Sequence, residues 1–266
     1  MVRKYGIEPY RIAVIHGGPG GMGSVAGLAR ELSKAYGVIE PLQSKYSIGE
    51  LIEELKEQLL QDCNSPALLI GHSWGAWLAG LFAARYPELV CKVLLIGCGP
   101  LTLDYVERIG ERRKANLTRE EAEELEELIG LLNQPKSKDM DRRLKRLGQL
   151  AETADYYCKM ELPIEPLEVL PANGEMYANL WPEAAQLRKS GELLHEFLQI
   201  KCALTIIQGD SDPHPYEGVI EPLTEGGRKH RFYLLEKCGH TPWKEQYAAS
   251  DFYRILNSEI MEQTLN

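Results

Sequence analysis

The sequence predicts an α/β fold in which a mostly parallel central sheet carries helices on both faces. Short apolar runs alternate with segments of helical periodicity over the first hundred residues, and again after residue 200. This alternation is typical of parallel sheets, whose consecutive strands are joined by crossover helices. Residues 101–199, between these two regions, are predominantly helical in pattern. We therefore predict one core formed by residues 1–100 and 200–266, with residues 101–199 inserted as a helical cap.

Six runs have the composition of strands, because they are short, rich in Val, Ile and Leu, and mostly end at glycine or proline. They are Arg11–Gly17, Gly37–Pro41, Ala67–Gly71, Cys91–Gly97, Cys202–Asp210 and His230–Glu236.

The segments between these strands have apolar residues at helical spacing. Gly37 is expected to end a first helix that begins near residue 24, and Pro87 one that begins near residue 74. Ser47 with Glu50, and Thr118 with Glu121, have the spacing of capping boxes at helix starts. The Thr118 segment has an apolar face on an otherwise glutamate-rich helix. This face holds Ala122, Leu125, Leu128, Ile129 and Leu132.

The stretch Leu69–Ala76, "LIGHSWGA", ends an apolar run in a serine between two glycines. Residues 71–75 match the pattern G-x-S-x-G, with a predicted strand before it and a predicted helix after it. At the tip of such a turn the serine takes a strained backbone conformation that exposes its hydroxyl, and glycines two positions away avoid collisions. The alternative is an ordinary helix N-cap, for which serine is well suited. This stretch alone leaves both interpretations of Ser73 open.

A glycine-rich turn, His16–Gly21 or "HGGPGG", follows the first predicted strand. Acyl transfer requires N–H donors aimed at the oxyanion of the tetrahedral intermediate. Such a turn can supply one donor, and the residue after the nucleophile supplies another. We predict that these donors are the amides of Gly18 and Trp74. A phosphate-binding loop is the alternative, but the sequence lacks the G-K-[ST] and dinucleotide-binding patterns.

Two later loops supply an acid and a base. "GDSDPHP" follows the strand near residue 209, and "KCGHTPW" follows the last strand. They give the order Ser73, Asp212, His240, in which imidazole takes the serine proton and carboxylate orients the imidazole. Asp210 is a second candidate for the acid, although its place directly after the strand favours a role in bracing the turn.

These four motifs, in this order and context, resemble the α/β-hydrolase fold superfamily. "G-D-x-D-P" followed by "C-G-H" looks like the acid and histidine loops of that superfamily, and the resemblance favours Asp212 and His240. The combination of "HGGPGG" with "HSWG" looks most like the proline-iminopeptidase branch. Members of that branch remove N-terminal proline from peptides without a cofactor.

The sequence departs from that branch at several points. The chain starts almost directly at the HGG strand, so the first two strands of the usual sheet are expected to be missing. Residues 42–50, "LQSKYSIGE", replace the arginine- and glycine-rich turn of the branch. No pair of cap glutamates stands out as the holder of a substrate ammonium group. Ester hydrolysis therefore remains at least as well favoured as peptide hydrolysis.

Composition limits the other functions. The formal net charge is −9 and no long basic stretch is present, which argues against nucleic acid as a partner. No signal peptide or apolar run of membrane-spanning length is present, and the six scattered cysteines suit reduced thiols in the cytoplasm. Neither cysteines nor histidines have metal-ligand spacing, so we predict no metal and no cofactor.

We therefore predict a serine hydrolase in which Ser73 attacks the carbonyl of a small ester or a short peptide. His240 acts as base and then acid, and Asp212 orients it. A catalytically silent binding protein on the same fold is the alternative from a different class, because a fold alone does not establish activity. The sequence does not indicate an oligomeric state. The aromatic candidates for the pocket wall, each of which could equally serve in packing, are Tyr156, Tyr157, Tyr177 and Trp181.

Overall fold

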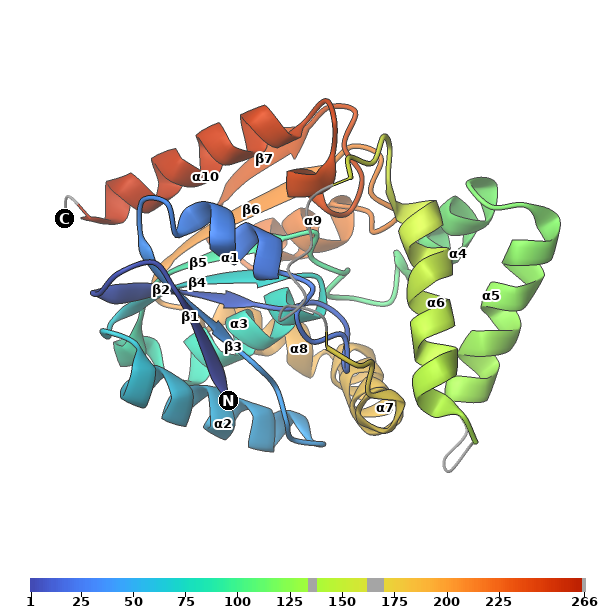
Figure 1. Cartoon of the computed structure of the whole chain (residues 1–266), viewed down its shortest axis with the longest axis horizontal. Helices are drawn as coiled ribbons and strands as arrows, with labels where there is room; N and C mark the ends of the chain where they lie inside the picture. The colour runs from blue at the N-terminus through green and yellow to red at the C-terminus, as the bar shows by residue number, and fades with distance from the viewer. Residues whose placement is uncertain (134–137, 162–169, 265–266) are drawn as a thin grey trace.

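A computed structural model describes residues 1–133, 138–161 and 170–264, and it confirms the predicted fold class (Figure 1). Its seven-stranded sheet has the order β1-β3-β2-β4-β5-β6-β7, in which every pair is parallel except β1 with β3. The strands are β1 (Val2–Tyr5), β2 (Tyr10–Ile15), β3 (Gly37–Pro41), β4 (Ala67–His72), β5 (Val90–Ile96), β6 (Ala203–Gly209) and β7 (Arg231–Leu235).

The expectation that both strands preceding the HGG strand would be missing is wrong. Strand β1 precedes β2 and pairs antiparallel with β3, placing Val2 opposite Pro41 and Tyr5 opposite Val38. The sequence "VRKY" has no extended apolar run, so local pattern did not reveal it. Its partner is the edge of β3, more than thirty residues away along the chain, and a contact of that range leaves no local signal.

Helices cover both faces of the sheet and define two apolar cores (Figure 1). One core contains buried residues of α1 (Ala26–Leu32) and α10 (Ala249–Thr264). The other contains residues of α2 (Ile48–Asp62), α3 (Trp74–Arg85), α8 (Glu192–Leu198) and α9 (Glu217–Glu225). Phe252 is fully buried in the first core and Phe82 in the second. Burial of each such side chain contributes roughly 2 to 3 kcal/mol of hydrophobic stabilisation.

Both helix starts predicted from capping residues are present, whereas one predicted helix end is not. Thr118 and Glu121 form a complete capping box at the start of α5 (Arg119–Leu132). Ser47 accepts the Glu50 amide at the start of α2, and its hydroxyl donates to the Glu50 carboxylate at 2.7 Å. Helix α1, however, ends at Leu32, before the expected stop at Gly37, and Gly37 opens β3 as predicted. A Cβ there would lie 2.5 Å from the carbonyl oxygens of Ile7 and Pro9.

The inserted segment contributes five helices within the described residues, namely α4 (Val106–Ala115), α5, α6 (Met140–Asp155), α7 (Gly174–Ser190) and α8. Helices α4, α5 and α6 form a lobe beside the sheet, with a small core around Leu125, Leu128 and Leu150 (Figure 1). Helix α8 instead packs beneath the sheet against α3. Phe197 fills the space over Gly80, where an added Cβ would lie 2.3 Å from the ring.

Candidate active site

Ser73 lies at a sharp turn between β4 and α3. Its backbone angles are φ 55° and ψ −119°, which a non-glycine residue adopts only when the surroundings enforce them. Its amide donates to the carbonyl oxygen of Ile96 at 2.9 Å, and its side chain makes no capping hydrogen bond. Ser73 thus stands at the N-cap position of α3, but its hydroxyl does not cap the helix.

The flanking glycines are required by close packing. A Cβ at Gly71 would lie 2.3 Å from the carbonyl oxygen of Gly75, and a Cβ at Gly75 would lie 2.3 Å from that of Ile15. Neither neighbour can move, because both oxygens belong to the backbone of the elbow and of the adjacent strand. The turn thus holds Ser73 against the end of β2.

The glycine-rich loop after β2 lies beside this elbow. A Cβ at Gly17 would lie 3.2 Å from the Cβ of Ser73, so the loop backbone passes close to the hydroxyl. The Gly17 amide donates to Ser24 Oγ at 3.3 Å. Gly18 is exposed and has φ 63°, a conformation that favours glycine. Within the described residues, neither the Gly18 amide nor the Trp74 amide donates to another protein group, so both can serve a ligand.

Asp212 and His240 come together at the carboxyl edge of the sheet, from the loops after β6 and β7. His240 Nδ1 donates to Asp212 Oδ2 at 2.9 Å and lies 3.1 Å from Oδ1. Asp212 is fully buried, and His240 is only 8% exposed. With Nδ1 protonated in this pair, His240 Nε2 is the nitrogen that can accept a proton.

Asp210 has the bracing contacts expected of it. Its carboxylate accepts the amides of Lys237 and Cys238 at 3.1 and 3.2 Å, and the Ser211 hydroxyl at 2.8 Å. It therefore ties the loop after β6 to the loop after β7, and it makes no hydrogen bond to His240 within the described residues.

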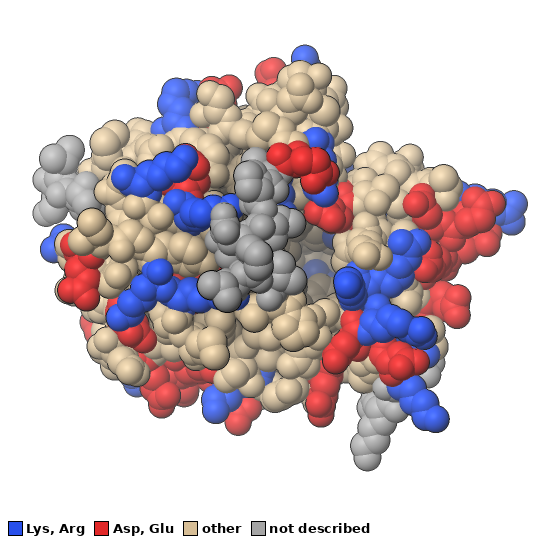
Figure 2. Space-filling view, in the orientation of Figure 1, with Lys and Arg blue, Asp and Glu red and all other residues tan. Residues whose placement is uncertain are grey.

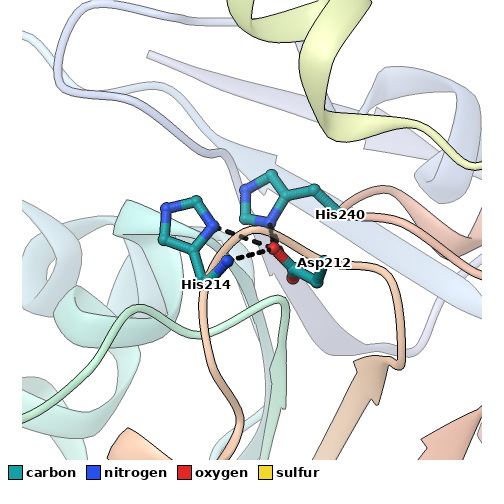
Figure 3. A group of neighbouring side chains, drawn as sticks. All are labelled: Asp212, His214 and His240. Atoms are coloured by element: carbon teal, nitrogen blue, oxygen red, sulfur yellow. Dashed lines mark hydrogen bonds and ion pairs between the residues drawn. The ribbon is translucent and has the colours of Figure 1, made fainter. Parts of the chain in front are cut away.

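His214 joins the acid and the base in a way that the sequence analysis missed (Figure 3). Its Nδ1 lies 2.9 Å from Asp212 Oδ1, its amide donates to the same oxygen at 2.8 Å, and its ring stacks on His240 with centroids 4.4 Å apart. The only sequence signal was its position two residues after Asp212, from which a side chain can return to the carboxylate.

Charge and burial set the protonation of this group. Burial alone would raise the pKa of Asp212, but His240 and His214 hold it below its usual range. Burial alone would lower the pKa of His240, but the charge and hydrogen bond of Asp212 hold it above its ordinary value. Burial lowers the pKa of His214, and His240 adds to that effect. At neutral pH the carboxylate is therefore ionised and His214 is neutral.

Two further histidines are structural parts of the same turns. Burial lowers the pKa of His72 to about 3 and that of His16 to about 4, so both are neutral. His72 Nε2 donates to the carbonyl oxygen of His240 at 3.0 Å. His16 Nε2 accepts the Gln43 amide at 3.4 Å, while its Nδ1 donates to the carbonyl oxygen of Gly17. These contacts fix the backbones of the glycine loop and of the histidine loop.

The cap's end is fastened to the histidine loop. The amide of His240 donates to the carbonyl oxygen of Asp155 at 2.7 Å, and Asp155 in turn receives two hydrogen bonds from Arg113, at 2.8 and 2.6 Å. The fully buried carboxylate of Glu245 accepts the amides of Tyr157 and Gly239, both at 2.8 Å. The segment after α6 therefore helps to position His240.

A pocket of about 320 Å³ opens above Ser73 and His240. The glycine loop lines one side, and Arg113, Glu152, Asp155 and Tyr156 line the cap side. Of the other aromatic candidates, Tyr157 packs edge-to-face against Tyr247, whereas Tyr177 and Trp181 stack on each other with centroids 5.9 Å apart. None of these three lines this pocket.

A larger pocket of about 980 Å³ lies at the amino ends of the strands, lined by residues such as Arg11, Gly37 and Leu68. It contains none of the predicted site residues. Ligands of open α/β sheets bind at the carboxyl ends of the strands. We therefore take the smaller pocket as the candidate site.

Asp212, His214 and His240 also offer three potential metal-ligand atoms within 4.8 Å of one another. In the structure the two Nδ1 atoms are each satisfied by the shared carboxylate (Figure 3). The cluster is complete as a hydrogen-bonded group, and we interpret it as a site for proton transfer.

Comparison with known proteins identifies the family. The family model described as "Alpha/beta hydrolase family" matches residues 12–250, which include most of both core segments and every motif of the site. The chain belongs to the alpha/beta hydrolase family. The family match thus confirms the superfamily resemblance that the motifs predicted.

Individual relatives of this alpha/beta hydrolase are distant. The monoacylglycerol lipase ABHD6 of Rattus norvegicus is 25% identical over 207 residues, which cover 76% of this chain and 58% of that protein. The chain spans about half the length of the curated relatives it matches.

Solved structures show the same fold. VinJ has a TM-score of 0.67 at 16% identity, with 98% of this chain and 94% of that one covered. Proline iminopeptidase of Mycobacterium smegmatis has a TM-score of 0.64 at 16% identity, with 99% and 95% covered. None of the described helices is long and apolar enough to cross a membrane.

Proposed function

We propose that this alpha/beta hydrolase cleaves carboxylic esters through a nucleophilic serine. The observation that carries the proposal is the strained elbow of Ser73, which opens into the same pocket as His240. The hydroxyl of Ser73 makes no capping hydrogen bond, and φ 55° is a strained backbone angle for serine. A role as nucleophile would account for that strain. The named relatives that are lipases favour the same reaction class.

In the proposed mechanism, His240 Nε2 removes the proton of Ser73 as its oxygen attacks the substrate carbonyl. Asp212 holds Nδ1 and stabilises the imidazolium that forms. The amides of Gly18 and Trp74 donate to the oxyanion of the tetrahedral intermediate. The imidazolium then protonates the leaving alcohol, and a water activated by His240 releases the acid from the acyl-enzyme.

No hydrogen bond to Ser73 Oγ is present within the described residues, although Ser73 and His240 line one pocket. In enzymes without substrate this bond is often long and shortens when the substrate binds. We propose that residues 101–199 act as the cap over this pocket and select the acyl group.

The charges in the pocket favour an ester over a substrate with a free ammonium group. Asp155 is neutralised by Arg113, and Glu152 pairs with Lys159 at 3.2 Å. Lys244, the fourth charged group of the pocket wall, is half-buried, and burial lowers its pKa. Both carboxylates of the wall thus already have a basic partner, so a substrate ammonium group would find no free carboxylate here. A neutral acyl chain needs none.

A substrate panel tests this proposal. Aryl esters of short and long acyl chains are compared with proline arylamide under the same conditions, using the wild type and Ser73→Ala. We expect ester turnover that is lost in the variant, with slower turnover of the arylamide. Hydrolysis of the arylamide alone would instead favour the aminopeptidase alternative. A folded protein that turns over neither substrate would favour the silent binding protein.

A further inference from the structure

Asp212 receives more hydrogen-bond donors than the proposed mechanism requires. Besides His240, its carboxylate accepts the amide and Nδ1 of His214, together with the side chain of Gln208 at 3.3 Å. Asp212 has no exposed surface, so among the described residues these donors take the place of solvent around its carboxylate. A buried carboxylate needs several donors to remain ionised. His214 supplies two of those donors to one oxygen.

The position of His214 is itself fixed. Gln208, which lies in β6 and is buried, donates to the carbonyl oxygen of His214 at 2.8 Å as well as to Asp212 Oδ2. Arg112 of α4 donates to the carbonyl oxygen of Asp212 at 3.0 Å. The loop that carries the acid is therefore held from the sheet and from the cap. The His214 ring is part of this fixed arrangement.

The ring of His214 also limits where the His240 ring can lie. The two rings stack with an interplanar angle of 30°, on one side of His240 (Figure 3). His72 lies against His240 as well, with centroids 4.8 Å apart. The His240 ring is thus in contact with two neutral imidazoles, which restrict its rotation away from Asp212.

We propose that His214 is a positioning residue, which as a neutral imidazole holds the Asp212 carboxylate and the His240 ring in the orientation that proton transfer from Ser73 requires. This inference rests on the proposed function. It extends that function because it adds a second histidine to the hydrogen-bonded group that transfers the proton. It also makes the group sensitive to a single substitution outside the three residues that react.

The proposal has an electrostatic consequence. His214 faces Asp212, His240 and Arg113, while His240 faces Asp212, Asp155, Arg113 and His72. The hydrogen bond from His214 Nδ1–H partly offsets the negative charge of Asp212, so the carboxylate stabilises a protonated His240 less. Removing this donor should strengthen the attraction between Asp212 and protonated His240. The pH at which His240 loses its proton should then move upward.

Two substitutions separate the hydrogen bond from the stacking. In His214→Asn, an amide N–H can take the place of Nδ1–H while the ring is lost. In His214→Phe, the ring remains and the donor is lost. His230→Asn is the matched control, because within the described residues the His230 ring hydrogen-bonds to the Arg228 carbonyl oxygen and to no group of the acid loop. Each variant is measured for ester kcat and KM from pH 5 to 9, and for thermal unfolding.

We expect His214→Phe to lower kcat by about tenfold to a hundredfold with little change in KM, because a hydrogen bond to a charged group is lost. Its pH–rate midpoint should rise above that of the wild type. His214→Asn should recover most of the rate and the wild-type midpoint. A role confined to stability would lower the unfolding temperature but leave kcat per folded molecule and the midpoint unchanged.

Wild-type rate and midpoint in folded His214→Phe would overturn the inference, and so would equal losses in both variants with no change of midpoint. Failure of the proposed function looks different. In that case the wild type itself neither hydrolyses esters nor reacts at Ser73 with a fluorophosphonate, whatever residue stands at position 214.

Discussion

Gly97, at the end of β5, lies against the proposed base. Its φ is 56°, and a Cβ there would lie 2.9 Å from His240 Nδ1 and 2.8 Å from the His240 carbonyl oxygen. Gly97→Ala should therefore displace the imidazole and reduce kcat at least tenfold, since a displacement of about 1 Å costs up to a hundredfold in rate. Gly99→Ala is the control, because a Cβ there meets only Trp77 at ordinary contact distance, 3.5 Å. Equal kcat values for the two variants would contradict the claim that Gly97 leaves room for the catalytic position of the His240 ring.

Asp212 and Asp210 should differ when each is changed to asparagine. Asp212→Asn removes the charge that holds the pKa of His240 above its ordinary value and loses the preferred tautomer. Its kcat should fall by about a thousandfold or more. Asp210→Asn keeps only one of the two oxygens that accept the Lys237 and Cys238 amides, so it should mainly lower the unfolding temperature. Rate assays with thermal unfolding of both variants test this, and the reverse pattern would assign the acid to Asp210.

The sequence identified residues best where chemistry imposes a motif. Ser73, Asp212 and His240 follow a fixed order of strand-end loops, and the structure brings Asp212 and His240 into contact. His214 and Glu245 had no such signal. Their roles depend on which backbone amides and which ring lie within 3 Å, and that is set by folding of distant segments.

At the scale of elements, a buried ion pair joins the sheet to α10. Lys92 of β5 lies 2.6 Å from Glu259 of α10, and both side chains are nearly inaccessible to solvent. Burial alone would raise the pKa of Glu259, but hydrogen bonds from Lys92, Thr205, Tyr233 and Arg231 lower it to about 2. The last helix is thus held to three neighbouring strands by one carboxylate.

Lys92→Met should leave this carboxylate short of a donor and destabilise the protein by about 3 kcal/mol. Arg254→Met is the matched control, because it removes an exposed pair with Asp251 on the same helix and should change stability by less than about 1 kcal/mol. Urea unfolding at pH 7 measures both. Equal effects of the two substitutions would show that the buried pair does not anchor α10.

The elements themselves were predicted where their pattern is local. The capping box of Thr118 and Glu121 forms as expected, and so do the six apolar strands. Strand β1 was missed because Val2–Tyr5 pairs with the edge of β3, a contact that does not depend on local propensity. Helix α1 ends at Leu32, before the Gly37 that was expected to stop it.

At the scale of the whole molecule, the buried histidines predict acid sensitivity. Burial lowers the pKa of His16 to about 4 and that of His72 to about 3, against an ordinary value of about 6.5 in the unfolded chain. Below pH 6.5 the unfolded state binds more protons than the folded state. Stability should therefore fall as the pH decreases from 6.5 toward 4, by up to about 1.4 kcal/mol per pH unit for each histidine.

Urea unfolding at pH 7 and pH 5 measures this dependence. His16→Asn should reduce the loss of stability between these values, whereas His195→Asn, at an exposed position in α8, should leave it unchanged. A free energy of unfolding that is the same at both pH values in the wild type would contradict the assignment of neutral, buried histidines.

Acidic and basic side chains lie close together over the lobe of α4, α5 and α6 on the face shown in Figure 2. Arg146 pairs with Glu124 and so joins α6 to α5. Ion pairs on the surface therefore join the helices of the cap to one another. Asp155, which pairs with Arg113, joins the cap to the histidine loop by accepting the His240 amide. The sequence predicted a helical insertion, but it could not show that the insertion's end would hold the His240 loop.

The most direct test of the central claim is to treat the folded protein with a fluorophosphonate at neutral pH and to locate the adduct by mass spectrometry of peptides. A nucleophilic Ser73 should carry one adduct on the peptide containing "GHSWG", and Ser73→Ala should carry none. Labelling should rise with pH as His240 loses its proton, with a midpoint above the ordinary histidine value. An unlabelled wild type, or an adduct on another residue that persists in Ser73→Ala, would contradict the account.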